Sequence, residues 1–232
     1  MLILVTGASK GIGLEIVKQL EEGGQHLVIA VSRKTEGLQK WVEQKNTRGV
    51  LPLKADISTS AGIKKIVSTI KNLQMPLDIL IHNAGMIVNK AYEKIKPEEL
   101  QAVYTTNVFA PFILTQALLP FLSKSKQAHV VNISSMGGFQ GSSKFPGLSA
   151  YSSSKAALSG LTECLAEELK PKGISVNCLA IGAVQTEMLS KAFPGYKAPL
   201  QPKQMAAYVC NFALNGKTYF NGKIIPVSST TP

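Results

Sequence analysis

Residues 2–13 read LILVTGASKGIG, an apolar run followed at once by a glycine-rich turn. The run from Leu2 to Val5 is typical of a buried strand. After the turn, apolar residues recur at helical spacing until Gly23 and Gly24, so a helix is expected to begin within the turn. Glycines let backbone N–H groups approach a pyrophosphate, and the start of a helix attracts its negative charge. The stretch therefore predicts a nucleotide-binding loop between a strand and a helix; a merely structural turn is the alternative.

Strand-like runs alternate with helical patterns from one end of the chain to the other. This alternation is typical of a parallel sheet with helices on both faces. We therefore expect one doubly wound Rossmann-type α/β domain over residues 1–232, with a seven-stranded parallel sheet. The expected strands are Leu2–Thr6, His26–Ser32, Val50–Lys54, Leu77–His82, His129–Ser134, Ser175–Ala180 and Lys223–Val227. The expected helices are Ile12–Leu20, Ile63–Leu73, Pro97–Leu122 and Tyr151–Leu169.

The composition fits one folded domain of ordinary size. Of the 232 residues 45% are hydrophobic and 17% are charged, so the chain can bury a core and is too apolar to be disordered. The net charge of +11 favours anionic partners in general. The lysines are scattered, however, without the interleaved aromatic residues that are typical of nucleic-acid binding. We interpret them as a solvated surface and expect no nucleic-acid partner.

No segment predicts a membrane span or a secretion signal. The longest apolar stretch, Phe109–Leu122, is interrupted by prolines and is shorter than the ~18 residues that suggest a membrane helix. The N-terminal apolar run stops at Thr6 and Gly7, without the basic residues of a signal peptide. We therefore expect a cytoplasmic protein that contacts no membrane.

The cysteines and histidines predict no metal site. They are Cys164, Cys178 and Cys210, with His26, His82 and His129. The cysteines form no CxxC pair, and we interpret them as small core residues. Each histidine lies in or beside an apolar run, where packing is a commoner role than catalysis or metal binding.

An arginine stands where the second strand is expected to end, in the sequence Ser32-Arg33-Lys34. An NAD site usually has an acid at this point, which accepts hydrogen bonds from the ribose 2′-OH. Arg33 can instead pair with a 2′-phosphate and stack on adenine, and Lys10 adds a second positive charge from the loop. The sequence therefore predicts NADP(H) as the cofactor; a solvated surface pair is the alternative.

Tyr151 and Lys155 are four residues apart in an expected helix, and therefore lie on one face of it. Such a pair arises by chance in many helices. Here it is accompanied by TGASKGIG at 6–13, Asn-Ala-Gly at 83–85, Asn107, and the serine pair that ends the fifth strand. In this order, the motifs resemble the short-chain dehydrogenase/reductase family over nearly the whole chain.

The resemblance implies a role for each member of a catalytic set. Tyr151 would be the acid/base, Lys155 its electrostatic partner and a ribose ligand, and Asn107 part of a proton relay through water. Ser135 would orient the substrate carbonyl, since the family's serine is the second of its pair and strand alternation turns Ser134 to the opposite face. The implied cofactor contacts are Tyr151, Lys155, Gly7, Ser9, Lys10, Gly11, Ile12, Gly13, Arg33, Asp56, Ile57, Asn83, Ala84, Gly85, Gly182, Val184 and Thr186.

The chemistry of the Tyr151 and Lys155 pair gives a further expectation. A phenol with a pKa of ~10 is a poor proton donor and acceptor at neutral pH unless its phenolate is stabilised. A cation ~4 Å away at an effective dielectric constant of ~20 contributes about 4 kcal/mol, or roughly 3 pKa units. We therefore expect the pKa of Tyr151 to lie near neutrality.

The predicted function is that of an NADP(H)-dependent oxidoreductase that interconverts a carbonyl and a secondary alcohol on a small-molecule substrate. A non-catalytic NADP(H)-sensing protein on the same fold is the alternative. The resemblance further implies a homodimer or homotetramer formed through the expected helices Pro97–Leu122 and Tyr151–Leu169. Prolines and a glycine break any regular pattern over Leu189–Pro202, where the resemblance implies a short substrate lid; a fixed surface connection is the alternative. The residues expected near the substrate, which are equally compatible with packing, are Met136, Phe139, Phe145, Met188, Leu189 and Phe193.

Three features depart from the usual family pattern. Ile181 precedes Gly182 where the family commonly has proline, so the turn loses a restraint on φ. The segment between Ser135 and Tyr151 is a few residues longer than usual, so access for the substrate is expected to differ. The chain ends at 226–232 without the frequent Asp-Gly-Gly, which weakens any inference about subunit packing through this tail.

Overall fold

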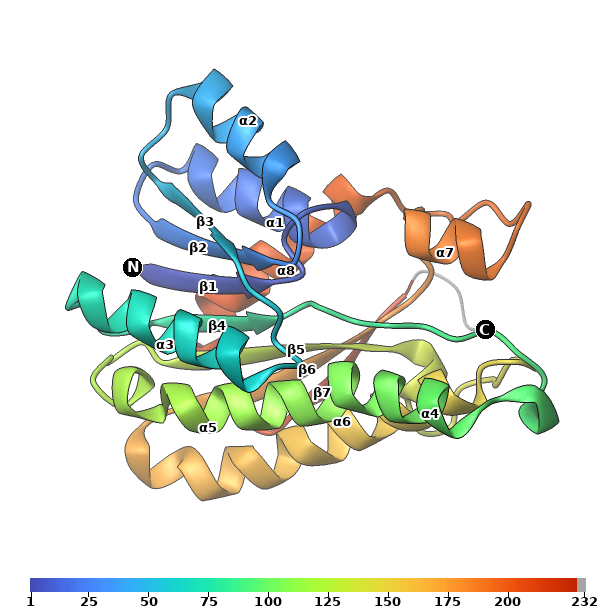
Figure 1. Ribbon diagram of the computed structural model, residues 1–232. Helices are drawn as coiled ribbons and strands as arrows, with labels where there is room; N and C mark the ends of the chain where they lie inside the picture. The colour runs from blue at the N-terminus through green and yellow to red at the C-terminus, as the bar shows by residue number, and fades with distance from the viewer. Residues whose placement is uncertain (229–232) are drawn as a thin grey trace.

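A parallel sheet forms the centre of the computed structural model, which describes residues 1–228 (Figure 1). Within these residues the sheet has seven strands in the order β3-β2-β1-β4-β5-β6-β7, which confirms the predicted fold class. The strands are β1 (Leu2–Thr6), β2 (Leu27–Ser32), β3 (Val50–Lys54), β4 (Ile79–His82), β5 (His129–Ser135), β6 (Ser175–Ile181) and β7 (Ile224–Val227). The order reverses between β1 and β4, and ligands bind at such a switch point in doubly wound sheets.

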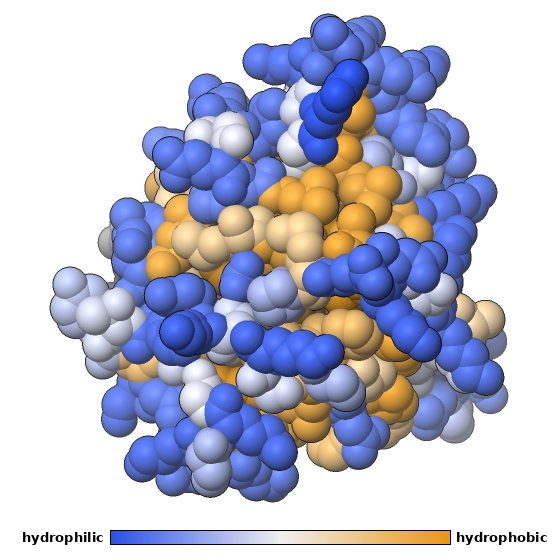
Figure 2. All heavy atoms as spheres, turned by 90° about the vertical axis from the view of Figure 1, so that its left-hand side faces the viewer, coloured by the Kyte–Doolittle hydropathy of each residue, from blue (hydrophilic) through white to orange (hydrophobic). Residues whose placement is uncertain are grey.

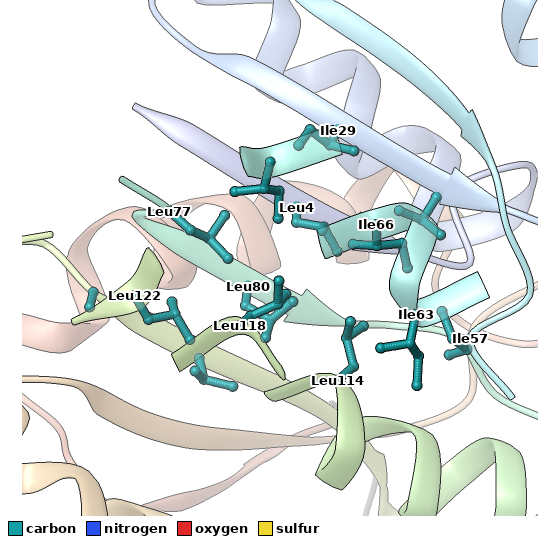
Figure 3. Close-up of a cluster of buried hydrophobic side chains, with 14 of the residues drawn as sticks. Leu4, Ile29, Ile57, Ile63, Ile66, Leu77, Leu80, Leu114, Leu118 and Leu122 are labelled. Atoms are coloured by element: carbon teal, nitrogen blue, oxygen red, sulfur yellow. The ribbon is translucent and has the colours of Figure 1, made fainter. Parts of the chain in front are cut away.

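Helices cover both faces of the sheet. They are α1 (Gly11–Glu22), α2 (Glu36–Lys45), α3 (Ser60–Leu73), α4 (Pro97–Tyr104), α5 (Ala110–Leu122), α6 (Ser149–Leu169), α7 (Glu187–Ala192) and α8 (Pro202–Asn215). One core lies between the sheet and α3, α5 and α6, as Figure 3 shows for Ile66, Leu118 and Leu80. The other core lies beneath α1, α2 and α8. Both faces of the strands are therefore buried, which explains their continuous apolar runs.

A proline lies in each edge strand of the sheet. Pro52 of β3 is in register with Ala30, and Pro226 of β7 is in register with Ala180. Proline cannot donate a ladder hydrogen bond, so it is tolerated at an edge and disfavours pairing with another strand.

The expected long helix Pro97–Leu122 contains a π-helical turn, η2 (Thr105–Phe109), that joins α4 to α5. The whole run of 26 residues is long and apolar enough to cross a membrane by length and composition, so our prediction from Phe109–Leu122 alone underestimated it. A core helix satisfies the same criterion, and Leu114, Leu118 and Leu122 of α5 are fully buried against the sheet.

The cysteine and histidine predictions are confirmed in part. Cys178 and Cys210 are buried, but Cys164 is exposed on α6, so its interpretation as a core residue was wrong. His82 and His129 are each 1% exposed, and burial lowers their pKa values to about 3 and about 4 respectively. Among residues 1–228, no group of three or more His, Cys, Asp or Glu side chains is placed to hold a metal ion.

Figure 2 shows the side of the molecule where the strands begin, the left-hand side of Figure 1. Hydrophobic residues gather across the middle of this face, with hydrophilic residues around them. The large exposed apolar side chains near the start of β1 and the end of α3 are Met1 and Met75, which are 43% and 38% exposed. The predicted site residues lie at the opposite ends of the strands.

Candidate active site

The loop after β1 has the shape of an anion-binding turn. Gly7 has a φ of +69°, and a Cβ there would lie 2.8 Å from the Ala84 Cα. A Cβ on Gly13 would collide with the Gly7 carbonyl oxygen, so both positions require glycine. Helix α1 begins with no side-chain cap and no acid in its first turn, which leaves its N-terminal N–H groups for a ligand. The loop therefore fits a pyrophosphate.

The segment after β4 is tied to this loop by hydrogen bonds. The Asn83 Nδ2 donates to the carbonyl oxygens of Thr6 and Gly7 at 3.0 and 3.2 Å. The backbone N–H groups of Asn83 and Ala84 both donate to the Thr6 Oγ1 at 3.1 Å. Asn83, Ala84 and Gly85 therefore line the switch point beside the glycine loop. Thr6 supports both segments, and sequence reasoning assigned it no such role.

Arg33 lines an open cleft of about 730 Å³, whose other walls include Ser58 and Met86. Burial alone would raise the pKa of Asp56, but hydrogen bonds from Ser58 and the charge of Arg33 lower it overall. The Ile57 side chain is buried in the core, so only its backbone faces this region. The adenine end of the predicted cofactor site therefore has Arg33 and Glu98 on the walls of the cleft, and the Asp56 carboxylate near Arg33 is fixed by Ser58.

Strand β5 and helix α6 bring the predicted catalytic residues together. The Ser134 Oγ donates to the Lys155 carbonyl oxygen at 2.9 Å, and the Ser135 hydroxyl forms a hydrogen bond with the Tyr151 side chain. Both serines therefore contact α6, Ser134 at the Lys155 backbone and Ser135 at the Tyr151 side chain. The Lys155 Nζ donates to the Ile133 carbonyl oxygen at 2.8 Å and lies 5.9 Å from the centre of the Tyr151 ring. This group sits where β5 ends.

Asn107 owes its position to the π-helical turn. Its side chain is fully buried, with Oδ1 accepting from the Met86 N–H at 2.8 Å. Its Nδ2 donates to the Met86 carbonyl oxygen and to the Ser154 Oγ, both at 2.9 Å. A Cβ on Gly85 would lie 3.5 Å from the Lys155 Nζ and 3.6 Å from the Asn107 Oδ1, so the three residues converge. Such turns are frequent at functional sites, because they re-aim one side chain.

The expectation for the pKa of Tyr151 was wrong. Burial raises the pKa of the phenol above its ordinary value, and the Ser135 hydroxyl offsets this only in part. Burial also lowers the pKa of Lys155 to about 8. Desolvation therefore outweighs the attraction between the pair, since Lys155 is buried, Tyr151 is partly buried, and the ammonium is bonded to the Ile133 carbonyl rather than to the phenol.

The segment after β6 forms the remaining wall. Gly182 donates from its N–H to the Val227 carbonyl oxygen at 2.9 Å, and Val184 is buried in a bridge to Leu200. Thr186 caps α7 by accepting from the Leu189 N–H at 3.2 Å, and its methyl lies about 3.5 Å from where a Gly11 Cβ would be. The cap makes α7 helical, so the expectation that 189–202 has no regular structure fails at its first residues.

Two further links cross this side of the site. The Lys10 Nζ pairs with Glu187 at 2.7 Å, and the Asn89 Nδ2 donates to the Ala192 carbonyl oxygen at 2.6 Å. Sequence reasoning missed Asn89 and Glu187, because each contact joins residues more than 100 positions apart. Among the residues expected near the substrate, Met136 is buried, whereas Phe145 and Met188 are 47% and 38% exposed. Phe145 also lines a second cleft of about 550 Å³.

A parallel sheet with this strand order, a glycine loop at its switch point and a Tyr-Lys pair where β5 ends define the class as Rossmann-type oxidoreductases. The chain belongs to the short-chain dehydrogenase family, whose model, described as short chain dehydrogenase, matches residues 1–197.

Relatives and solved structures agree with this assignment. Mouse dehydrogenase/reductase SDR family member 4 is 32% identical over 99% of this chain and 86% of that protein. A 3-oxoacyl-(acyl-carrier-protein) reductase of Staphylococcus aureus is 31% identical over 80% of this chain and 75% of that protein. The 3-ketoacyl-(acyl-carrier-protein) reductase of Brucella melitensis, solved with NADH, has a TM-score of 0.85 at 26% identity, over 97% of this chain and 96% of that chain. The protein is therefore an oxidoreductase with a nucleotide-binding Rossmann fold.

Proposed function

We propose that the protein interconverts a carbonyl and a secondary alcohol with NADP(H), using Asn107, Ser135, Tyr151 and Lys155. The observation that carries this proposal is the convergence of these side chains at the end of β5, beside the glycine loop that fits a pyrophosphate. When bound, the nicotinamide would supply or accept the hydride.

In the reducing direction, the Tyr151 hydroxyl gives its proton to the carbonyl oxygen of the substrate. The Ser135 hydroxyl donates a hydrogen bond to the same oxygen as negative charge builds on it. The nearby Lys155 ammonium then stabilises the phenolate, whose pKa in the free protein is raised by burial. Asn107, fixed by three hydrogen bonds, holds its position between α6 and the segment after β4.

The preference for NADP(H) is supported by Arg33, which lines the cleft next to the end of β2 where an NAD site usually has an acid. Charge-assisted hydrogen bonds contribute about 1.5–3 kcal/mol, so the ratio of kcat/KM for NADPH to that for NADH should be at least about tenfold. Arg33→Asp should lower kcat/KM for NADPH and raise kcat/KM for NADH. Equal kcat/KM for the two cofactors in the wild type would refute the preference.

The reaction itself is tested with a panel of ketones, aldehydes, quinones and 3-oxoacyl thioesters, followed by NADPH absorbance. Steady oxidation of NADPH in the presence of any of these carbonyls supports catalysis. Tight NADPH binding without turnover on the whole panel would favour the sensing protein instead.

Subunit association is a further part of the proposal. The exposed apolar side chains at the junction of η2 and α5 support it, since Phe109, Phe112 and Ile113 are 43%, 48% and 47% exposed. Covering them in a homodimer or homotetramer would remove an apolar surface from water. Light scattering should give a mass of at least twice 24.8 kDa, and Phe112→Lys should shift it to the monomer.

A cytoplasmic location stays a prediction, to be checked by cell fractionation.

A further inference from the structure

Glu187 forms an ion pair across the mouth of the predicted cofactor site. Its Oε2 lies 2.7 Å from the Lys10 Nζ, and its Oε1 lies 2.5 Å from the Lys191 Nζ. Lys191 belongs to the same short helix α7, whereas Lys10 belongs to the glycine loop, 177 residues away in sequence. The carboxylate therefore links α7 to the start of α1.

The position of Lys10 makes this pair relevant to the cofactor. Lys10 precedes the first residue of α1, and the N–H of Ala8 in the same loop donates to the Val31 carbonyl oxygen at 3.1 Å. This bond ties the loop to β2 just before Arg33. Lys10 and Arg33 are the two cations that the sequence offers to a 2′-phosphate, yet Lys10 is already bonded to Glu187.

The side chains of Lys10 and Glu187 are 63% and 50% exposed, so both can move without disturbing the core. Hydrogen bonds and charge from Lys10 and Lys191 lower the pKa of Glu187 to about 2. The carboxylate is therefore charged throughout the neutral range and is a constant competitor for Lys10.

We propose that Glu187 determines cofactor specificity by competing with the 2′-phosphate of NADP(H) for Lys10, which reduces the preference for NADP(H) over NAD(H). This inference rests on the proposed NADP(H) dependence. NAD(H) carries a hydroxyl in place of the phosphate, so it leaves the Lys10–Glu187 pair intact. Breaking the pair therefore weakens only NADP(H) binding. Glu187 acts through Lys10 and is a positioning residue.

Lys191 provides a control of opposite sign. Lys191 and Lys10 both pair with the Glu187 carboxylate, so removal of the Lys191 ammonium leaves Lys10 as the one partner of that carboxylate among the described ion pairs. Lys191→Met should therefore strengthen the competing pair and lower the preference for NADP(H). Glu15→Gln provides a control for net charge, because Glu15 is an acid of α1 that pairs with Lys18 at 2.8 Å.

The test measures the dissociation constants of NADP⁺ and NAD⁺ by isothermal titration calorimetry, at low salt and at about 0.5 M salt. At the higher concentration, salt strongly screens the charges from one another. In Glu187→Gln, the ratio of Kd for NAD⁺ to Kd for NADP⁺ should rise about two- to fivefold, the range of an exposed ion pair. The ratio should fall in Lys191→Met and stay unchanged in Glu15→Gln. In a Lys10→Met background, Glu187→Gln should have no effect, and high salt should reduce every difference.

The proposal is overturned if Glu187→Gln leaves the ratio of the two dissociation constants unchanged. It is likewise overturned if the variant binds both dinucleotides more weakly by the same factor, because the ion pair would then hold either cofactor in place. It is also overturned if Glu187→Gln still raises the ratio when Lys10 is absent. Failure of the proposed function gives a different result, since the wild type would then bind neither dinucleotide or would bind both equally well.

Discussion

The buried charge of Lys155 should lower the free energy of unfolding of the protein. It is 4% exposed, and burial lowers its pKa from 10.5 to about 8. At pH 7 this shift corresponds to about 3 kcal/mol of destabilisation, because the folded state holds a charge that it solvates poorly. Lys155→Met keeps the length of the side chain and removes the charge. It also removes the hydrogen bond to the Ile133 carbonyl oxygen, a loss of about 1 kcal/mol.

The expected net effect at pH 7 is a gain of about 2 kcal/mol in the free energy of unfolding. For a chain of this length, each kcal/mol raises Tm by about 2–4 °C, so Tm should rise by about 4–8 °C. Turnover should be lost in the same variant. Lys64→Met on the exposed face of α3 is the matched control and should leave Tm nearly unchanged.

The sign of the pH dependence gives a second check. Between pH 8 and pH 10.5 the unfolded lysine still holds its proton and the folded one has released it, so wild-type stability rises with pH there. The advantage of Lys155→Met should therefore shrink by about 2 kcal/mol between pH 7 and pH 9.5. Thermal unfolding followed by circular dichroism measures both quantities. A variant that melts below the wild type, or a Tm difference that is the same at both pH values, would refute the reasoning.

Three other outcomes are expected. Tyr151→Phe should lower kcat at least about 10²-fold while calorimetry finds cofactor affinity nearly unchanged, and retention of a tenth of wild-type kcat would contradict the acid/base role. His129 has a pKa of about 4 in the folded protein and stays neutral below pH 6.5, where the unfolded state takes up a proton, so about 3 kcal/mol of stability should be lost between pH 6.5 and pH 4. Denaturant unfolding of His129→Leu should show a smaller loss of stability over this pH range, and a loss equal to that of the wild type would contradict the prediction. Hydrogen exchange over 189–202 should slow when NADPH and a carbonyl ligand bind, and unchanged protection in the ternary complex would rule out a lid. Faster exchange in ligand-free Asn89→Ala would show that the hydrogen bond to the Ala192 carbonyl oxygen restrains the segment.

Helix α8 was not predicted, although Met205, Val209 and Phe212 recur at helical spacing and are buried. Helix α2 gave a weaker signal, because Leu38 is its one buried residue and the rest of it is mostly polar. The predicted helices Ile12–Leu20, Ile63–Leu73 and Tyr151–Leu169 were found, whereas the expected Pro97–Leu122 is divided by η2 into α4 and α5.

The sequence by itself determined the alternation of strands and helices, the glycine loop and the order of the motifs. Each of these depends on residues within a few positions of one another, where apolar spacing and glycine geometry act directly. Only the tertiary structure decided how Asn107 is aimed, how far burial shifts the pKa values of Tyr151 and Lys155, and that Glu187 holds Lys10. These properties depend on desolvation and on contacts between distant segments, which exist only after the sheet has brought the ends of its strands together.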